Sequence, residues 1–313
     1  MHCLITGASG FIGNALVEKL RDDGDVTLTT VTRSNDRIFP EGIVHLPVAI
    51  TPETDWSEAL KSVDVVVHLA ARAHVLKDDS ADPLAVFRSE NTASALNLAE
   101  QAAKAGVKRL VFISSIGVNG MQSIRPFRHD DPPAPTEPYA ISKHESEIAL
   151  KAVAGRTRME LVIIRPPLVY GPNAPGNFAR LVNLVLKRLP LPLGSVRNRR
   201  TLVALANLVD LIALCMRHPA AAGEVFLAGD AEDLSTPDLI RAIADGLGIK
   251  PALYPFPVSI LRGALAIAGK QDLFDRLCGS LQVDISHARD VLGWSPAITP
   301  REGLRLAVTP ILK

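Results

Sequence analysis

The stretch Leu4-Ile5-Thr6-Gly7-Ala8-Ser9-Gly10-Phe11-Ile12-Gly13 decides how this sequence folds. An apolar run that begins at the first residues leads directly into three glycines, each three residues from the next. A helical pattern follows, because Ile12, Leu16 and Leu20 recur at four-residue steps. The order strand, glycine turn, helix is typical of dinucleotide binding, in which phosphates sit at the helix N-terminus, where free N–H groups and the helix dipole favour anions.

Each glycine of this turn has its own expected task. Gly7 permits the tight turn, Gly10 lets a pyrophosphate approach the backbone, and Gly13 lets the helix pack closely against the strand. Three glycines alone also fit an ordinary strand–turn–helix. Their place on the first strand, ahead of further strand–helix units, favours cofactor binding.

The composition limits which classes of protein this chain can belong to. With 313 residues, 47% of them hydrophobic, it can form one large domain or two closely joined ones. The net charge of +1 argues against a broad contact with nucleic acid or a membrane surface. The chain opens on a core strand without a signal sequence, and its apolar runs are too short to predict a membrane span. The apolar segment 258–268, interrupted by Arg262, is expected to be a helix that faces the core.

The cysteines and histidines indicate neither disulfides nor metal. Cys3, Cys215 and Cys278 are odd in number and scattered, which suits reduced, buried thiols in a cytoplasmic protein. The eight histidines show no metal-ligand spacing, so no metal site is expected.

The end of the second expected strand, 26–32, bears on the choice of cofactor. In NAD-binding folds an Asp or Glu there accepts hydrogen bonds from the adenosine ribose, whereas an Arg suits the 2′-phosphate of NADP. Here Thr32 and Arg33 stand at that place, with no carboxylate. A solvated loop arginine is the competing interpretation. Because an Arg fork matches phosphate geometry, the sequence favours NADP(H) and leaves NAD(H) open.

Further strands alternate with helices along the first half of the chain. They are expected at 43–46, 64–69, 109–113 and 161–164, with a helix at 92–105. This alternation predicts an α/β fold, a Rossmann-type doubly wound parallel sheet. At the end of the fourth strand, Leu69, Ala70 and Ala71 would let the strand lie against a cofactor, or simply pack tightly in the sheet.

The rhythm of the chain changes after Gly171, where short helices and strands replace the regular units. We therefore expect an NAD(P)-binding domain at 1–171 and a smaller, mixed α/β substrate domain at 172–313, with some chain interchange between them.

Tyr139 and Lys143 lie one turn apart in an expected helix, so they share a face. A lysine ammonium near the phenol favours the phenolate and would lower the pKa of Tyr139 toward the working range of an acid–base group. The pair lies on the helix after the fifth strand and downstream of Ser115, and this placement gives it value. The polar, proline-rich segment 121–138 is expected to be a loop over the active site.

Five motifs in this order resemble the extended short-chain dehydrogenase/reductases. They are Thr6-Gly7-Ala8-Ser9-Gly10-Phe11-Ile12-Gly13, His68-Leu69-Ala70-Ala71, Ser114-Ser115, Tyr139-Ala140-Ile141-Ser142-Lys143 and Arg165-Pro166-Pro167-Leu168-Val169-Tyr170-Gly171-Pro172. Within that family the match is to the nucleotide-sugar epimerase, dehydratase and reductase group, and it covers essentially the whole chain. The run 165–210 is similar to bacterial enzymes that act on UDP-linked N-acetyl-6-deoxyhexoses for surface polysaccharides.

The resemblance implies a role for each motif. Ser115 would hydrogen-bond the reacting sugar oxygen, Tyr139 would be the general acid–base, and Lys143 would bind the nicotinamide ribose. The other cofactor-binding positions would be Gly7, Ser9, Gly10, Phe11, Ile12, Arg33, Leu69, Ala70, Ala71, Asn91 and Pro166. Asn91 would also support the catalytic loop, and Asn177 and Arg200 would contact the substrate diphosphate. Two copies would pair through the helices at 92–105 and 139–154, which implies a homodimer.

Two positions depart from the pattern of the group. An acidic residue that contacts adenine is expected after the third strand, where this chain has Pro47-Val48-Ala49-Ile50. Asn207 stands where an aspartate is more usual, and we expect it to cap the following helix.

Three reactions compete within the group. A 4,6-dehydratase is disfavoured, because its Asp-Glu pair is replaced here by Ile116-Gly117. Arg33 favours NADPH, and NADPH favours net reduction, so the expected activity is 4-keto reduction of a UDP-4-keto-6-deoxy-N-acetylhexosamine. A UDP-sugar 4-epimerase of the UDP-glucose or UDP-N-acetylglucosamine type, with tightly bound NAD, is the alternative. A non-catalytic dinucleotide-binding protein is the third interpretation.

Overall fold

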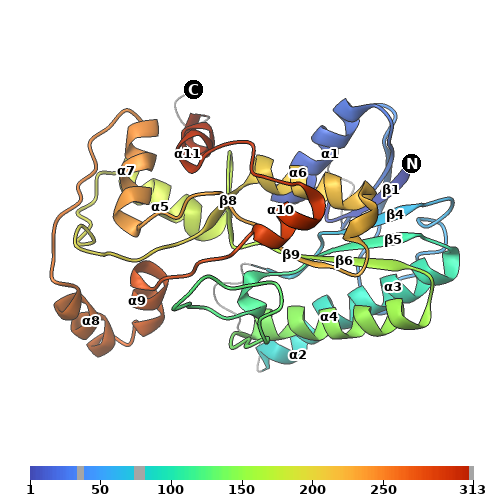
Figure 1. Cartoon of the computed structure of the whole chain (residues 1–313), viewed down its shortest axis with the longest axis horizontal. Helices are drawn as coiled ribbons and strands as arrows, with labels where there is room; N and C mark the ends of the chain where they lie inside the picture. Colours follow the sequence, from blue (N-terminus) through green and yellow to red (C-terminus); the bar gives the residue numbers. More distant parts are fainter. Residues whose placement is uncertain (34–38, 74–81, 310–313) are drawn as a thin grey trace.

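Seven parallel strands form the central sheet of the computed structural model, which describes residues 1–33, 39–73 and 82–309 (Figure 1). In spatial order the strands are β3 (Val44–Pro47), β2 (Thr27–Thr32), β1 (His2–Thr6), β4 (Val65–His68), β5 (Arg109–Ile113), β6 (Glu160–Arg165) and β9 (Val225–Leu227). Neighbouring strands are parallel throughout. The strand order reverses next to β1, so the predicted Rossmann-type doubly wound sheet is confirmed.

Both faces of this sheet are covered by helices, because successive strand residues point to opposite sides and both sides are apolar. Cys3 and Ile5 pack with α1 (Phe11–Asp23) and α6 (Leu205–Arg217) on one face. Leu4 packs on the other face with α3 (Ser94–Ala105) and α4 (Pro138–Arg156). Figure 1 shows these two helical layers above and below the strands.

A third apolar core lies in the C-terminal part of the chain. It surrounds a two-stranded parallel sheet of β7 (Leu168–Tyr170) and β8 (Leu202–Ala204). Its helices are α5 (Gly176–Leu186), α7 (Thr236–Gly246) and α11 (Pro300–Val308). The remaining helices are α2 (Pro83–Phe87), the π-helix η1 (Arg88–Ala93), the 3-10 helices η2 (Ile116–Val118) and η3 (Pro219–Ala221), α8 (Val258–Ile267), α9 (Gln271–Cys278) and α10 (Ser286–Leu292).

The chain crosses between these two parts more than once. β9 and α6, both beyond residue 171, belong to the large sheet and its covering layer. Conversely, β7 lies before residue 171 and pairs with β8. The domain boundary at residue 171 stays a prediction. The segments that cross it are β7 on one side and α6 and β9 on the other.

Asn207 does not cap a helix as expected. α6 begins at Leu205, so Asn207 lies inside it and is buried. Its amide nitrogen donates to Asp230 Oδ1 at 2.7 Å, and its oxygen accepts from the backbone N–H of Ala297 at 3.0 Å. Asn207 therefore fastens α6 to the segment that leads into α11, which is a tertiary role that helix pattern alone does not reveal.

The segment 258–268 forms the predicted helix, α8, and one face of it lies toward the third core as expected, but the core does not enclose the helix. No residue of α8 is buried, and Ile267 is 92% exposed. Val258 and Leu261 reach the third core, and the rest of α8 lies outside it. In the described part of the chain, no helix has the length and apolar character needed to cross a membrane.

Candidate active site

The glycine turn between β1 and α1 is tightly packed against the end of β4. Gly7 has φ of +69°, and a Cβ there would lie 2.8 Å from the backbone nitrogen of Ala70. A Cβ on Gly13 would lie 2.3 Å from the Gly7 carbonyl oxygen, so α1 sits directly on the turn. Gly10 is the N-cap of α1 and offers no side-chain cap, and Ser9 beside it is exposed. An accessible helix N-terminus of this kind suits a pyrophosphate.

His68 fixes the end of β4 next to this turn. Its Nδ1 lies 2.7 Å from Thr6 Oγ1, which also accepts the backbone N–H of Ala70 at 3.3 Å. Burial lowers the pKa of His68 to about 3, with a smaller contribution from Lys143, so the ring is neutral at physiological pH. Leu69, Ala70 and Ala71 follow His68 and are half-buried. The backbone of Leu69 and Ala70 lies against Gly7 of the glycine turn.

Asn91 lies on a π-helical turn, η1, which begins before the helix expected at 92–105. The Asn91 side chain accepts the backbone N–H of Arg72 at 2.7 Å and donates to Ser142 Oγ at 3.0 Å. It thereby ties the segment after β4 to α4. π-turns occur frequently at functional sites, and no short-range sequence pattern distinguishes them from an α-helix.

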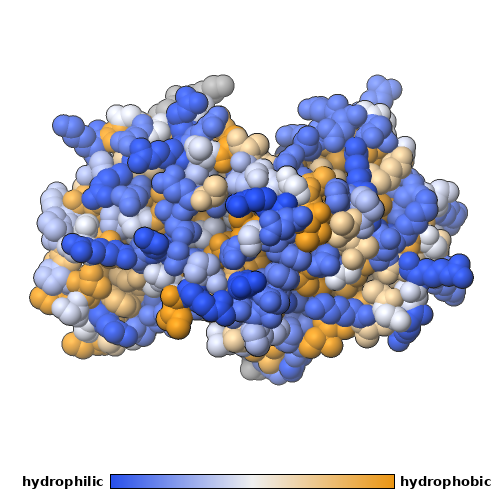
Figure 2. Space-filling view, in the orientation of Figure 1, coloured by the Kyte–Doolittle hydropathy of each residue, from blue (hydrophilic) through white to orange (hydrophobic). Residues whose placement is uncertain are grey.

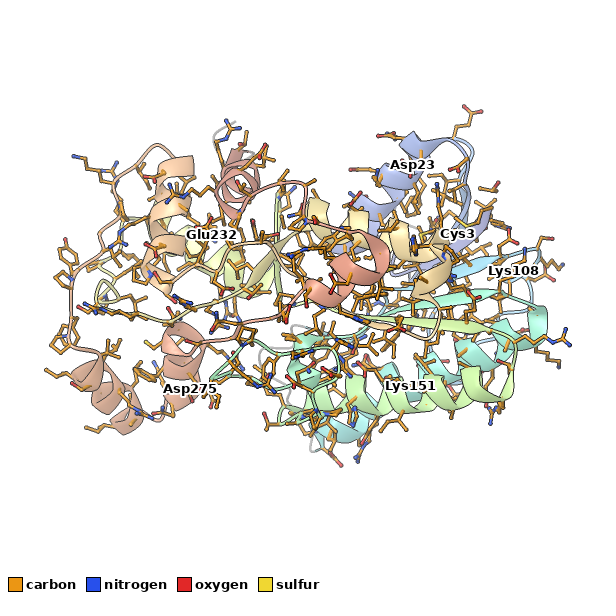
Figure 3. The ribbon with its side chains drawn as sticks, viewed as in Figure 1. Cys3, Asp23, Lys108, Lys151, Glu232 and Asp275 are labelled. Atoms are coloured by element: carbon orange, nitrogen blue, oxygen red, sulfur yellow. The ribbon has the colours of Figure 1, made fainter. Side chains whose placement is uncertain are left out.

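Ser115, Tyr139 and Lys143 lie around the carboxyl end of β5. Ser115 is the N-cap of η2, and its Oγ accepts the Gly117 N–H at 3.1 Å. A Cβ on Gly117 would lie 3.1 Å from Ala140 Cβ, so the first turn of α4 packs directly on this segment. Lys143 Nζ donates to the Ile113 carbonyl at 2.7 Å. In Figure 3, Lys151 marks α4 two turns beyond Lys143.

The expectation that Lys143 lowers the pKa of Tyr139 is wrong for this arrangement. Burial raises the pKa of Tyr139 to about 12, because removal from water disfavours the phenolate. The Lys143 ammonium is held by the Ile113 carbonyl and lies 4.4 Å from the centre of the Phe112 ring. Burial lowers the pKa of Lys143 itself to about 7, and Glu147 opposes that shift.

Glu147 is a residue of this site that sequence reasoning missed. It lies four residues after Lys143, on the same face of α4, and accepts a hydrogen bond from Ser114 Oγ at 2.6 Å. It also forms an ion pair with Arg165 at the end of β6. The four-residue spacing from Tyr139 through Lys143 to Glu147 was the signal that could have found it.

The loop at 121–138 is fastened to the C-terminal part of the chain. Ser123 N–H donates to the Ser280 carbonyl at 2.9 Å, and Phe127 N–H donates to the Gln282 carbonyl at 2.8 Å. Ala134 N–H donates to the Val118 carbonyl at 2.9 Å, which brings the loop back beside η2. The loop therefore connects the segment after Ser115 with the strand-like stretch that follows α9.

The remaining predicted residues are spread over both parts of the structure. The Pro166 carbonyl accepts the Ile116 N–H at 3.0 Å, directly beside Ser115. Arg200 is half-buried, and its Nη1 donates to the Gly279 carbonyl at 2.9 Å. Asn177 is exposed on the first turn of α5. Phe11 and Ile12 begin α1, and Phe11 reaches toward the third core.

Arg33 is exposed after β2, and the residues that follow it, 34–38, lie outside the described part of the chain. After the third strand, where an acidic residue was expected, the chain has Val48, whose N–H donates to the Thr32 carbonyl at 2.9 Å.

Among the described residues, no group of His, Cys, Asp and Glu side chains could hold a metal ion.

A groove of about 590 Å³ lies between α1, α6 and α11. Its lining includes Glu18, Lys19, Leu205 and Leu306, and none of the predicted site residues contributes to it. Its volume alone therefore does not make it the active site, because chemistry-bearing side chains are gathered at the carboxyl ends of β4, β5 and β6.

Comparison with known proteins agrees with this geometry. Residues 3–229 match the family model described as the NAD dependent epimerase/dehydratase family. A Vibrio cholerae protein named UDP-glucose 4-epimerase is 44% identical over 313 residues, covering 99% of this chain and 95% of that protein.

Two solved structures share the fold. The Thermotoga maritima UDP-glucose 4-epimerase with UDP-glucose has a TM-score of 0.80 at 24% identity and covers all of both chains. The Bacillus cereus UDP-glucuronic acid 4-epimerase in complex with NAD has a TM-score of 0.79 at 23% identity, covering 98% of this chain and 97% of that one. The glycine turn, the Tyr139–Lys143 helix and the match over 3–229 together place this chain in the NAD dependent epimerase/dehydratase family.

Proposed function

We propose that this protein is a UDP-hexose 4-epimerase that works with tightly bound NAD. The observation that carries the proposal is the 44% identity, over nearly the whole length of both chains, to a protein named UDP-glucose 4-epimerase. It favours the alternative drawn from the sequence over 4-keto reduction of a UDP-4-keto-6-deoxy-N-acetylhexosamine. The presence of Ser115, Tyr139 and Lys143 at one strand end supports an enzyme over a non-catalytic binding protein.

The residues of the site fit a dinucleotide. The backbones of Gly7 and Ala70 approach so closely that a Cβ on Gly7 would not fit between them. This bare backbone and the N-terminus of α1 suit the pyrophosphate of a dinucleotide. Leu69, Ala70, Ala71, Asn91 and Pro166 border the same strand ends. Lys143 donates to the Ile113 carbonyl, and the further donors of its ammonium would hold the nicotinamide ribose.

We propose NAD in place of the NADP that Arg33 favours. The matching family is described as NAD dependent, and a structure of the same fold is described as a complex with NAD. Arg33 is exposed, which supports its interpretation as a solvated loop arginine. When bound, NAD would supply the hydride acceptor for the oxidation of carbon 4 and the hydride donor for its reduction, so no external reductant would be consumed.

The chain's own residues handle the proton and the substrate. Tyr139 takes the proton of the 4-hydroxyl when carbon 4 is oxidised and returns it when the ketosugar is reduced from the other face. The positive charge of a bound oxidised nicotinamide would favour the phenolate that this step needs and that burial alone disfavours. Ser115 Oγ hydrogen-bonds the same oxygen and stabilises its developing charge. Arg200 and Asn177 would contact the diphosphate of the UDP-sugar, and the loop at 121–138 would cover the sugar.

We further propose a homodimer formed through α3 and α4. Ile148 on α4 is 56% exposed, although α4 packs against α3 along its other face, and this supports a partner there. A cytoplasmic location is supported by Cys3, Cys215 and Cys278, which are free thiols.

The test is to incubate the purified protein with UDP-glucose or UDP-N-acetylglucosamine, without added cofactor, and to follow the sugar proton signals by NMR. We expect conversion to the 4-epimer, and NAD in the supernatant after denaturation. Loss of NADPH absorbance with a UDP-4-keto-6-deoxy-N-acetylhexosamine, and no epimerisation, would establish the reductase instead. Bound NAD with no turnover of any of these sugars would establish the non-catalytic protein.

A further inference from the structure

α8 carries two apolar stripes, and the core occupies one of them. Val258, Leu261 and Leu265 are half-buried and recur at three- and four-residue steps on the inner face. Ile260, Ala264 and Ile267 form the opposite stripe, and all three are exposed. Ile260 is 57% exposed and Ile267 is 92% exposed. A helix that is apolar on both faces is normally buried on both, so the outer stripe of α8 calls for a partner.

The segments on either side of α8 extend this surface. Tyr254 and Phe256, in the loop before the helix, are 56% and 37% exposed, and Leu273 on α9 is 44% exposed. Together with Ile260 and Ile267 they make up what we call the α8 patch. Figure 2 shows hydrophobic residues at the lower left, where Figure 1 places α8 at the end of the molecule opposite the large sheet. Five large apolar side chains gathered in this way are uncommon on a surface that contacts only water.

Basic side chains predominate around the α8 patch. Residues 250–279 contain the basic Lys250, Arg262, Lys270 and Arg276 against Asp272 and Asp275, and Arg276 is ion-paired with Glu137. Lys270 is exposed directly after α8, and Asp275 is labelled on α9 in Figure 3. Leu191 and Gly194 are hydrogen-bonded to the segment 252–254, and the exposed Lys187 and Arg188 come shortly before them. Apolar side chains with a basic surround match the surface of an anionic lipid bilayer, where the side chains enter the acyl boundary and the cations meet the headgroups.

We propose that the α8 patch docks this protein peripherally on an anionic lipid bilayer. A ten-residue helix is too short to span a bilayer but suits a flat position in its interface. A second copy of the chain is the less favoured occupant, because a two-fold interface would place the same basic side chains opposite one another. α9 leads from the patch to Gly279, whose carbonyl holds Arg200, so docking would bring the substrate part of the molecule to the membrane.

The test is co-sedimentation of the full chain with vesicles. Vesicles of phosphatidylcholine with about a third phosphatidylglycerol are compared with phosphatidylcholine alone. We expect binding to the anionic vesicles, at least about fivefold weaker for the double variant Ile260→Ser/Ile267→Ser, since both changes remove apolar area from the contact. Val44→Ser is the matched control, because Val44 is 50% exposed on β3, at the edge of the large sheet. Raised salt should also weaken wild-type binding, because it screens the basic side chains.

Three results would overturn the proposal. Wild-type protein that stays in the supernatant with anionic vesicles would remove it. Equal binding by the double variant and by Val44→Ser would move the contact elsewhere. A wild-type dimer that the double variant splits, with no lipid binding by either, would assign the α8 patch to a second copy. Thermal unfolding and epimerase activity in solution should be unchanged in the double variant, because the exposed faces of Ile260 and Ile267 contact neither the core nor the catalytic side chains.

Discussion

Arg165 at the end of β6 forms a two-pronged, buried ion pair with Glu147 of α4. Arg165 Nε lies 2.9 Å from Glu147 Oε1 and Nη2 lies 2.5 Å from Oε2, and the two side chains are only 3% and 2% exposed. Ser114 donates to the same carboxylate, and Arg165 Nη1 donates to Asn119 Oδ1 at 3.0 Å. Because Glu147 follows Lys143 by one turn, this pair fixes the catalytic face of α4 on the ends of β5 and β6.

Breaking this pair from one side should be strongly destabilising. Glu147→Gln leaves the Arg165 guanidinium buried without a charged partner, for which we expect a loss of about 3–5 kcal/mol in the free energy of unfolding. Arg165→Met should lose a similar amount for the complementary reason. Urea denaturation of both variants and of the double variant measures the coupling, and the double variant should lose clearly less than the sum.

The exposed pair Arg156–Glu100 provides the matched control. Its side chains are 60% and 50% exposed, so the same cycle there should give a coupling of at most about 1 kcal/mol. Equal coupling energies in the two cycles would show that the buried pair does not anchor α4.

Removal of the Tyr139 hydroxyl should abolish most turnover without unfolding the protein. Tyr139→Phe keeps the ring and its edge-on contact with Phe87, 6.1 Å between centroids, but cannot move the proton of the sugar hydroxyl. We expect kcat for epimerisation to fall by about 10²–10⁴ while the content of bound NAD is unchanged. Tyr254→Phe, at an exposed tyrosine, should retain full activity. Equal activity of the two variants would remove Tyr139 from the mechanism.

Sequence reasoning located the strands well because a buried parallel sheet leaves a plain signal. Arg109–Ile113 was expected at the bounds that the structure has, since it is a short run rich in β-branched and apolar residues between turn signals. The glycine turn was equally readable, because Gly7 and Gly13 leave no room for a Cβ. Local patterns of this kind depend on neighbours in the chain, which the sequence contains.

What sequence reasoning missed depends on contacts between distant segments. The outward face of α8 could not be told from an inward one, because its pattern is apolar on both sides. Asn207 looked like a helix cap, whereas its partners Asp230 and Ala297 come from elsewhere in the chain. The pKa of Tyr139 depends on how deeply the site is buried and on where Lys143 points, and a four-residue spacing does not determine either one.

Mild acid should destabilise the protein through His68. Burial lowers the pKa of His68 to about 3, whereas the unperturbed value is 6.5. Below pH 6.5 the unfolded chain therefore binds a proton that the folded chain does not, and stability that is fully present above this pH is lost as pH falls. The contribution is at most about 1.4 kcal/mol per pH unit.

His68→Gln keeps a side chain that can hydrogen-bond Thr6 and cannot be protonated. Its free energy of unfolding should fall less than that of the wild type when the pH is lowered from about 7 to about 5, as measured by urea denaturation. Parallel slopes for the two proteins over that range would mean that His68 does not stay neutral in the folded state.

Alanine substitutions at Gly7 and Gly24 distinguish two effects of a lost glycine, namely the strain of a positive φ and the clash of a new Cβ with a neighbouring segment. Both have positive φ, +69° and +72°, so alanine at either position should cost about 1–2 kcal/mol of stability. A Cβ at Gly24 meets nothing within 4 Å, whereas at Gly7 it would press on the backbone of Ala70. Gly7→Ala must therefore shift the end of β4 or the turn, and both border the proposed pyrophosphate site.

We expect purified Gly24→Ala to retain its bound NAD and Gly7→Ala to lose most of it. The measurement is the NAD content released on denaturation, together with the free energy of unfolding from urea titration. If Gly7→Ala kept as much NAD as Gly24→Ala, the contact between the glycine turn and Ala70 would not shape the cofactor site. Loss of NAD from Gly7→Ala, with a stability change well above that of Gly24→Ala, would assign the difference to the close approach, since both positions have nearly the same positive φ.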